Sequence, residues 1–332
     1  MSARESARPA AHGAGRVDGG VAPVGATVRV TVPASTGNVG PGFDSLGLAL
    51  EHRDTVSLTR IREGLEFELH GEGSQDVPRT GEHLVLRAAQ AAFDAAGAGV
   101  LPPVRLTAHN VIPHGRGMGS SASAVVAGVL AGNALLPASA RLSDDALLQV
   151  CSRLEGHPDN VAPTLLGGLT ISWETEGHFH SVPMAVHPDV VPVVAVPDFE
   201  VATAVARGLL PETVAHRSAA VTAGRAALLV AALGQHPELL LDATHDLLHQ
   251  PYRAQAMAPS WELVTGLRER GHAALISGAG HGADAREGWA AGASGAGGDR
   301  GDHRGPGVVD PPPRGRARVV AGACPAGARR GC

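Results

Sequence analysis

The loop at residues 113–122, with the sequence PHGRGMGSSA, is the part of the chain best suited to bind phosphate. Its alternating glycines let the backbone approach a ligand closely. The apolar run that follows predicts a helix, whose N-terminus would present free N–H groups and a favourable dipole to an anion. Ser120 and Ser121 add hydroxyl groups where a magnesium ion would bridge phosphates. Spacing alone leaves a second interpretation open, a glycine loop capped by serine.

This loop fits neither of two common nucleotide-binding patterns. A G-x-G-x-x-G motif that starts at Gly115 would need glycine at position 120, where the chain has Ser120. A Walker loop needs lysine, and the sequence contains none, so all 27 of its basic residues are arginine. Any phosphate chemistry must therefore rely on backbone N–H groups, arginines and a metal ion.

Two further segments combine polar side chains with turn-forming residues. The stretch EGHPDNVAP at 155–163 could bring the carboxylates of Glu155 and Asp159 near one site, one for a metal ion and one for a substrate. The alternative is a helix end followed by a Pro-Asp-Asn turn. The segment at 33–44, PASTGNVGPGFD, is dense in turn-forming and polar residues, which by themselves indicate only a loop.

One other group of side chains could bind a metal ion. His245 and His249 lie four residues apart on a predicted helix that also carries Asp242. No pattern for a third ligand accompanies them, and chance pairs are common among the 17 histidines of the chain. We therefore interpret this pair as part of a solvated helix face.

Hydrophobic patterns predict a mixed protein in which strands and helices position these segments. They predict strands at 27–32, 54–59, 65–69, 104–108, 169–173, 190–196 and 272–276. They predict helices at 83–96, 121–135, 143–155, 219–233, 237–248 and 260–269. The absence of a strict βαβ repeat favours an α+β fold over a doubly wound sheet.

Composition separates a globular middle from two biased ends. Residues 1–24 are rich in Ala, Gly, Arg and Pro, so we expect a disordered leader there. Residues 281–332 contain no Leu, Ile, Met or Phe and cannot bury enough apolar surface to offset the entropy of ordering, which predicts a disordered tail. The net charge of −5 gives no basic excess for nucleic acid or an anionic membrane. The longest apolar run is too short to cross a membrane, and we expect a cytoplasmic protein.

In this order, the segments at 33–44, 113–122 and 155–163 resemble the motifs of the homoserine kinases, which belong to the GHMP small-molecule kinases together with galactokinase and mevalonate kinase. The resemblance covers about residues 26–280, and EGHPDNVAP points to homoserine kinases among these. It implies a GHMP kinase fold, with an ATP-binding N-terminal domain at 25–180 like the second domain of ribosomal protein S5. A ferredoxin-like C-terminal domain would follow at 181–280. The implied reaction is ATP- and magnesium-dependent phosphorylation of the side-chain hydroxyl of L-homoserine, on the route to threonine.

The resemblance also implies roles for individual residues. Asn38 and Asp44 would orient the acceptor hydroxyl and form the catalytic set with Thr203, while proton abstraction by Asp44 stays open. Glu155 and a hydroxyl of Ser120 or Ser121 would hold magnesium. The residues implied to contact ATP are Pro113, His114, Gly115, Arg116, Gly117, Met118, Gly119, Ser120 and Ser121.

The implied homoserine site contains both acidic and basic groups. Asp159 would bind the substrate ammonium group, with His157 and Asn160 beside it. Arg207 closes a T-x-x-x-R segment that matches the family, and Arg253 closes Gln-Pro-Tyr-Arg. Two guanidinium groups suit a carboxylate because each can donate two parallel hydrogen bonds. Outside such matched segments, a lone arginine is more often a solvated surface charge.

The chain departs from the family after the sequence SGAG at 277–280. In the family this motif continues with proline and an apolar strand, but here His281 and the biased tail follow. We interpret the tail as the product of a frameshift in a GC-rich gene, which would remove the last strand of the C-terminal domain. Reduced stability is the expected consequence, and whether this chain keeps its activity stays open. Two alternatives stay open, another GHMP-type kinase and an inactive relic that binds only nucleotide, and a homodimer is compatible with the family.

Overall fold

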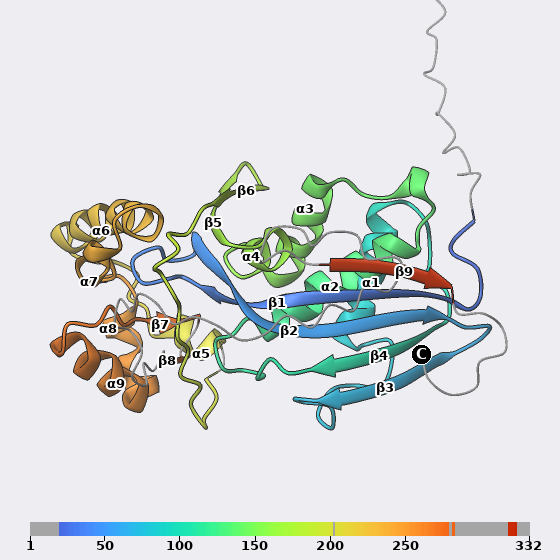
Figure 1. Cartoon of the computed structure of the whole chain (residues 1–332), viewed down its shortest axis with the longest axis horizontal. Helices are drawn as coiled ribbons and strands as arrows, with labels where there is room; N and C mark the ends of the chain where they lie inside the picture. Colours follow the sequence, from blue (N-terminus) through green and yellow to red (C-terminus); the bar gives the residue numbers. More distant parts are fainter. Residues whose placement is uncertain (1–19, 202, 279–280, 283–317, 324–332) are drawn as a thin grey trace, which may run out of the picture.

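A mainly antiparallel sheet runs along the molecule (Figure 1). The computed structural model describes residues 20–201, 203–278, 281–282 and 318–323. Within them the strand order is β3-β4-β2-β1-β9, and β5 pairs with both β2 and β6. The strands are β1 (Ala26–Gly37), β2 (Leu46–Arg60), β3 (Leu65–Gly71), β4 (Val104–Asn110), β5 (Leu169–Thr175), β6 (His178–Met184) and β9 (Arg318–Ala323). The predicted strands at 27–32, 54–59, 65–69, 104–108 and 169–173 are confirmed.

The pairing of β1 with β2 carries the segment at 33–44 to one end of the sheet. The register runs from Thr27 opposite Thr59 to Gly37 opposite Gly47, with a shift between Pro33 and Ser35. The chain leaves β1 at Gly37, turns through residues 38–45 and re-enters the sheet as β2. This turn therefore lies where the sheet ends, and the sheet fixes its two stems.

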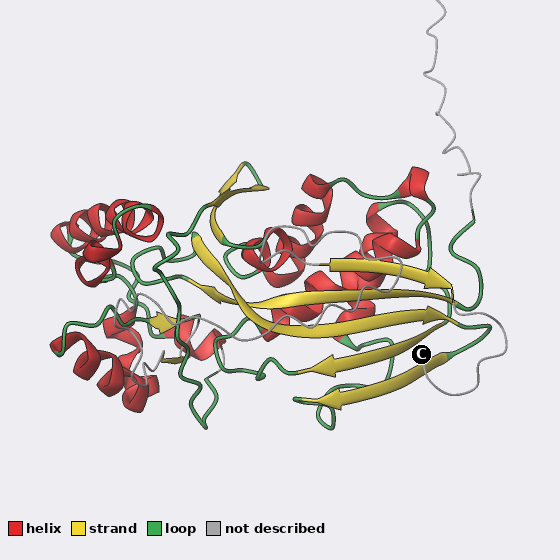
Figure 2. Cartoon of the chain, viewed as in Figure 1, coloured by secondary structure: helices red, strands yellow, loops and turns green. Residues whose placement is uncertain are grey.

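Four helices pack on one face of this sheet, as Figure 2 shows in red against the yellow strands. They are α1 (Leu84–Ala95), α2 (Ser120–Leu135), α3 (Asp144–Glu155) and α4 (Val161–Leu166). Helix α2 lies between α1, α3 and the sheet, and most of its residues are buried. Burial on all sides explains why its sequence is apolar throughout rather than amphipathic.

Helices α1 and α2 approach each other closely at two glycines of α2. A Cβ atom on Gly128 would lie 2.3 Å from the carbonyl oxygen of Val85, and one on Gly132 would lie 2.6 Å from that of Ala89. Both neighbours are backbone atoms, which cannot rotate away as a side-chain end could. The position of α2, and of the glycine loop at its N-terminus, therefore depends on these two residues.

We expect a Gly128→Ala substitution to lower the free energy of unfolding by about 2 kcal/mol, because the added methyl group forces α1 and α2 apart. Urea denaturation measures this change. Gly224→Ala is the matched control, since Gly224 lies in a helix with open space around it. This substitution should raise the free energy of unfolding by about 0.5–1 kcal/mol. Equal effects at the two positions would contradict the close packing of α1 on α2.

The chain after β6 is mainly helical in its described part. Figure 1 shows these helices gathered at the end of the sheet away from β3 and β4. They are α5 (Thr203–Gly208), α6 (His216–Gly234), α7 (Leu240–Ala243), α8 (Gln250–Arg253) and α9 (Ala258–Glu269), with short 3₁₀ turns at Pro237–Leu239 and Ala254–Met257. A further 3₁₀ turn, Ala138–Ala140, lies between α2 and α3. The predicted helix at 237–248 is wrong after Ala243, where the chain leaves the helical conformation. Two short strands, β7 (Ile276–Ser277) and β8 (His281–Gly282), pair with each other.

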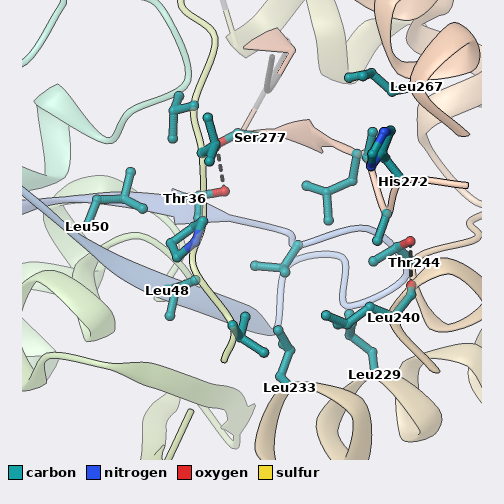
Figure 3. A pocket seen from close by; sticks show the side chains of 18 residues that line it. Thr36, Leu48, Leu50, Leu229, Leu233, Leu240, Thr244, Leu267, His272 and Ser277 are labelled. Carbon is teal, nitrogen blue, oxygen red and sulfur yellow. Dashed lines mark hydrogen bonds between the residues drawn. The ribbon is translucent and has the colours of Figure 1, made fainter. Parts of the chain in front are cut away.

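An apolar pocket separates two segments that were predicted to be strands. Residues 190–196 form no strand, and of residues 272–276 only Ile276 belongs to one, so these two predictions are wrong for most of their length. Figure 3 shows the pocket, with leucines of β2 on one side and leucines of α6 and α7 on the other. Its lining also includes Val190, Val193, Val194 and Leu275. Within the described residues no strand lies between the two segments, so neither is paired there as a member of a sheet.

The two ends of the chain differ in part from the expected leader and tail. Val21 and Ala22 pack against the apolar core, and Arg60 Nη1 donates to both their carbonyl oxygens, so the ordered part begins before residue 25. Strand β9, within the expected tail, pairs antiparallel with β1. Residues 1–19, 283–317 and 324–332 lie outside the described residues. The described helices include none with the length and apolar character that crossing a membrane requires.

Candidate active site

The glycine loop is built so that backbone N–H groups at the start of α2 face a polar pocket. Gly115, Gly117 and Gly119 all have positive φ angles, which favour glycine, and Gly119 is the N-cap of α2. A Cβ atom on Gly119 would also lie 2.3 Å from Ser35 Oγ, so glycine is needed there for space as well as for conformation. Ser123 Oγ ties the first turn of the helix to the carbonyl oxygen of Pro33.

This pocket collects residues from all the motifs that the sequence singled out. Among the residues predicted for the site, thirteen line it: Asn38, Gly115, Arg116, Gly117, Gly119, Ser120, Ser121, Glu155, His157, Asp159, Asn160, Arg207 and Arg253. Asp44 lines an adjoining hollow together with Glu155, His157 and Arg207. Pro113, His114 and Met118 are not among the described lining residues, and Met118 is instead buried in an apolar cluster beneath the loop. Thr203 begins α5, but its side chain lies outside the described residues.

The turn between β1 and β2 is held in a strained conformation. Asn38, Val39 and Asp44 have φ angles of 67°, 46° and 55°, a region that side chains branched at Cβ, such as that of Val39, rarely adopt. The Asn38 side chain secures the turn, because its Nδ2 donates to the carbonyl oxygen of Gly278 and its Oδ1 accepts from the Asp44 N–H. Both ends of this amide are therefore engaged within the protein.

The segment after α3 supplies a buried carboxylate with two defined partners. Asp159 is only 1% exposed; its Oδ1 lies 2.6 Å from His157 Nδ1, and its Oδ2 accepts from the backbone N–H of Asn38 at 3.0 Å. Asn160 Oδ1 accepts a hydrogen bond from Ser35 Oγ. These contacts join the segment at 155–163 to the end of β1, although the two are more than 100 residues apart in the chain.

The hydrogen bond that His157 Nδ1 donates to Asp159 raises the pKa of His157, although burial opposes the shift. A histidine whose pKa is higher in the folded state stabilises the fold fully below its unfolded pKa of about 6.5. This stabilisation is lost as the pH rises through the higher folded value. We therefore expect NMR titration to give a pKa for His157 above about 6.5. Urea denaturation should give a higher free energy of unfolding near pH 6 than near pH 8. A His157→Gln variant should show a smaller difference, and a His157 pKa at or below 6.5 would contradict the assignment.

Ser121 and Glu155 form a small oxygen-rich group at the N-terminus of α2. Ser121 Oγ donates to Glu155 Oε2 at 2.9 Å, and burial raises the pKa of Glu155. Within the described residues, no group of three or more His, Cys, Asp or Glu side chains could hold a metal ion by itself. A magnesium ion fits one carboxylate and a hydroxyl when nucleotide phosphates and water complete its ligands, which is its usual arrangement beside phosphates.

The two predicted arginines differ in how they are paired. Arg207 makes two hydrogen bonds to Asp44, Nη1 to Oδ2 at 3.0 Å and Nη2 to Oδ1 at 2.6 Å. Arg253 is 1% exposed and forms no ion pair within the described residues. Its Nη1 lies 3.4 Å from the carbonyl oxygen of Gly278 and from His249 Nδ1, and its Nε has no partner. Desolvation lowers the pKa of Arg253. A buried guanidinium that lacks an anion is an arrangement suited to an anionic ligand.

The role of Ser277 and Gly278 was missed in the assignment of site residues. Ser277 Oγ lies 2.6 Å from Thr36 Oγ1 and donates to the carbonyl oxygen of Gly117 at 2.7 Å. The Gly278 N–H donates to the carbonyl oxygen of Gly37. These bonds join the glycine loop to the end of β1. The family-like sequence SGAG was the signal that could have identified them.

His249 also differs from expectation. It was interpreted as part of a solvated helix face, but its side chain is fully buried. Its Nε2 lies 2.7 Å from the carbonyl oxygen of Gly40, within the strained turn. His245, in contrast, is exposed. The break in the helix after Ala243 explains the difference, because residues beyond it no longer follow a helical face.

Comparisons with known proteins agree on one family. Residues 83–168 match the model of the GHMP kinases N terminal domain. Homoserine kinases of Streptomyces coelicolor and Streptomyces avermitilis are 51% and 50% identical to this chain, over 77% of it and 82% and 84% of their own lengths. The crystal structure of homoserine kinase from Cytophaga hutchinsonii superposes with a TM-score of 0.68 at 27% identity, covering 76% of this chain and 82% of that one. Phosphomevalonate kinase of Streptococcus pneumoniae shares the fold, with a TM-score of 0.54 at 14% identity over 78% of this chain and 90% of its own.

Proposed function

Because this chain belongs to the homoserine kinases of the GHMP kinase family, we propose that it transfers the γ-phosphoryl group of ATP to the side-chain hydroxyl of L-homoserine. The product is O-phospho-L-homoserine, an intermediate on the route to threonine. The observation that carries this proposal is the polar pocket itself. It holds both the N–H groups at the start of α2 and the buried, anion-free guanidinium of Arg253.

The glycine loop is the part of the pocket suited to the nucleotide. Backbone N–H groups at a helix N-terminus bind phosphate without any need for lysine. Arg116 lines the same pocket, and its Nε is buried without a hydrogen-bond partner, so it can add a positive charge beside the phosphates. Ser121 and Glu155 would hold magnesium, which neutralises developing charge on the transferred phosphoryl group when it is bound.

Arg253 is the residue best suited to the substrate carboxylate, because no carboxylate of the described residues forms an ion pair with it, although Asp44, Asp159 and Asp246 act on its charge at longer range. Both Nη atoms of Arg207 already donate to the Asp44 carboxylate. Arg207 can therefore bind the substrate carboxylate only if it shares its N–H groups between the two carboxylates or releases Asp44. Asp159, buried and acidic, is suited to the ammonium group, with His157 and Asn160 beside it. An amino acid that carries both charges matches this pocket better than a neutral sugar does.

Asp44 would orient the acceptor hydroxyl once the Arg207 contact is shared with substrate. Phosphoryl transfer has a loose transition state, so orientation and electrostatic stabilisation supply most of the rate enhancement. Asn38 contributes through its bonds to the Asp44 N–H and to Gly278, which fix the turn that carries Asp44. Asn38 also lines the polar pocket, where it would face the acceptor hydroxyl.

The test is ADP release by this chain with L-homoserine, with mevalonate and with a sugar as acceptor. We expect release only with homoserine. A version in which residues after Ser277 are replaced by the corresponding segment of the Streptomyces coelicolor enzyme serves as the reference for full activity. ATP binding without acceptor-dependent ADP release in both versions would contradict the proposed reaction, and release only with another acceptor would redirect it to that substrate.

A further inference from the structure

The ring of Phe43 lies against both arginines of the pocket. The guanidinium carbon of Arg253 lies 5.1 Å from the ring centroid, and that of Arg207 lies 5.7 Å from it. Both distances are within the range in which the negative face of an aromatic ring attracts a cation. Phe43 is not among the described residues that line the polar pocket, so its effect on a ligand there would be transmitted by the arginines.

His249 supports the same ring from a buried position. The two rings are stacked, with centroids 4.8 Å apart and planes 22° from parallel. The carbonyl oxygen of Gly40 can only accept a hydrogen bond, so Nε2 of His249 carries the proton. Nδ1 is then an acceptor and faces Nη1 of Arg253 at 3.4 Å. His249 therefore contacts the turn, the Phe43 ring and one guanidinium.

The two guanidinium groups need such support because they carry the same charge. Each Arg207 Nη atom donates to Asp44, but Arg253 has no carboxylate among its described contacts. A ring that attracts both cations offsets their repulsion and limits the positions they can adopt. The backbone on either side of Phe43 limits where its ring can lie. Asp44 has a φ of 55°, and a Cβ atom on Gly42 would collide with the side chain of Leu46.

We propose that Phe43, supported by His249, is a positioning residue that holds Arg207 and Arg253 at the spacing required to bind the carboxylate of the substrate. This proposal rests on the proposed function. It assigns selectivity for a carboxylate-bearing alcohol to an aromatic ring that does not touch the substrate.

The test compares Phe43→Leu with Phe43→Tyr in the full chain. Leucine keeps an apolar side chain of similar bulk but removes the aromatic face, whereas tyrosine keeps that face. In Phe43→Leu we expect KM for L-homoserine to rise about tenfold, with kcat and KM for ATP nearly unchanged. Phe43→Tyr should behave like the parent chain.

A second acceptor separates positioning from general damage to the fold. 3-Aminopropan-1-ol is homoserine without its carboxylate, so its kcat/KM should be the same in the parent and in Phe43→Leu. The preference for homoserine over this alcohol would then fall about tenfold. An unchanged preference, or an equal loss for both acceptors together with a changed KM for ATP, would overturn the proposal.

A binding measurement decides the proposal even if the proposed reaction fails. Absence of homoserine-dependent ADP release in the parent chain would count against the proposed function alone. Acetate can then be titrated while the arginine Nε–H signals are followed by NMR. We expect those of Arg253 and Arg207 to respond in the parent and to need about tenfold more acetate in Phe43→Leu. An equal response in both would overturn the role of Phe43.

Discussion

An Arg253→Met variant is expected to lose at least about 30-fold in kcat/KM for homoserine without losing stability in the absence of substrate. Removing one partner of a buried, hydrogen-bonded charge pair costs about 2–5 kcal/mol, which corresponds to about 30-fold to several thousand-fold. The substrate carboxylate would be left without its buried partner. In the substrate-free protein, however, the Arg253 guanidinium is itself a buried charge that forms no ion pair with any described carboxylate.

A buried charge of this kind opposes folding, as the lowered pKa of Arg253 also indicates. Replacing such a group with an apolar side chain is often neutral or stabilising. The free energy of unfolding of Arg253→Met should therefore equal or exceed that of the parent. Steady-state kinetics and urea denaturation measure the two effects separately.

Arg268→Met is the control, because Arg268 is a half-buried arginine whose pKa is likewise lowered by desolvation. It donates to Thr244 Oγ1 and to the carbonyl oxygens of Ala274 and Leu241, all within the protein. Its loss should reduce stability and leave KM for homoserine unchanged. If Arg253→Met destabilises the chain as Arg268→Met does, or keeps its kcat/KM, the assignment of Arg253 to the substrate is wrong.

Local signals in the sequence were sufficient for the glycine loop and the helix behind it. Three glycines with positive φ, followed by serines and an apolar run, produce a structure that depends mainly on neighbouring residues. The strands of the central sheet were equally clear, because their alternation reflects one buried face. Only the resemblance to a family brought the distant motifs into one site, since no periodicity links residues 38, 159 and 253.

Contacts between distant residues are what the sequence did not disclose. Nothing local indicates that Arg207 would pair with Asp44, or that Ser277 would bridge Thr36 and the glycine loop. The strand predictions at 190–196 and 272–276 failed for a related reason. Their apolar composition is typical of strands, but a strand forms only where a partner supplies hydrogen bonds, and no described strand lies between them.

The apolar pocket between these two segments underlies the second large effect that we expect. Replacing the residues after Ser277 with the C-terminal segment of the Streptomyces coelicolor relative should raise the free energy of unfolding by about 3 kcal/mol or more. Each apolar side chain that fills the pocket contributes about 1.5–3 kcal/mol, partly offset by the cost of ordering the added backbone. Strand β9 is lost in this replacement, so the gain must exceed what the pairing of β9 with β1 provides.

Two measurements identify the pocket as the origin of the gain. Urea denaturation gives the change in stability, and fluorescence of an apolar dye should fall because the leucines in Figure 3 would no longer be accessible to it. The control carries the same segment with its apolar residues changed to serine, which adds backbone but cannot fill an apolar pocket. Equal stability of the two versions would show that the segment acts elsewhere. A gain confined to the apolar version would show that residues 190–196 and 272–277 form a site that can take up a further strand.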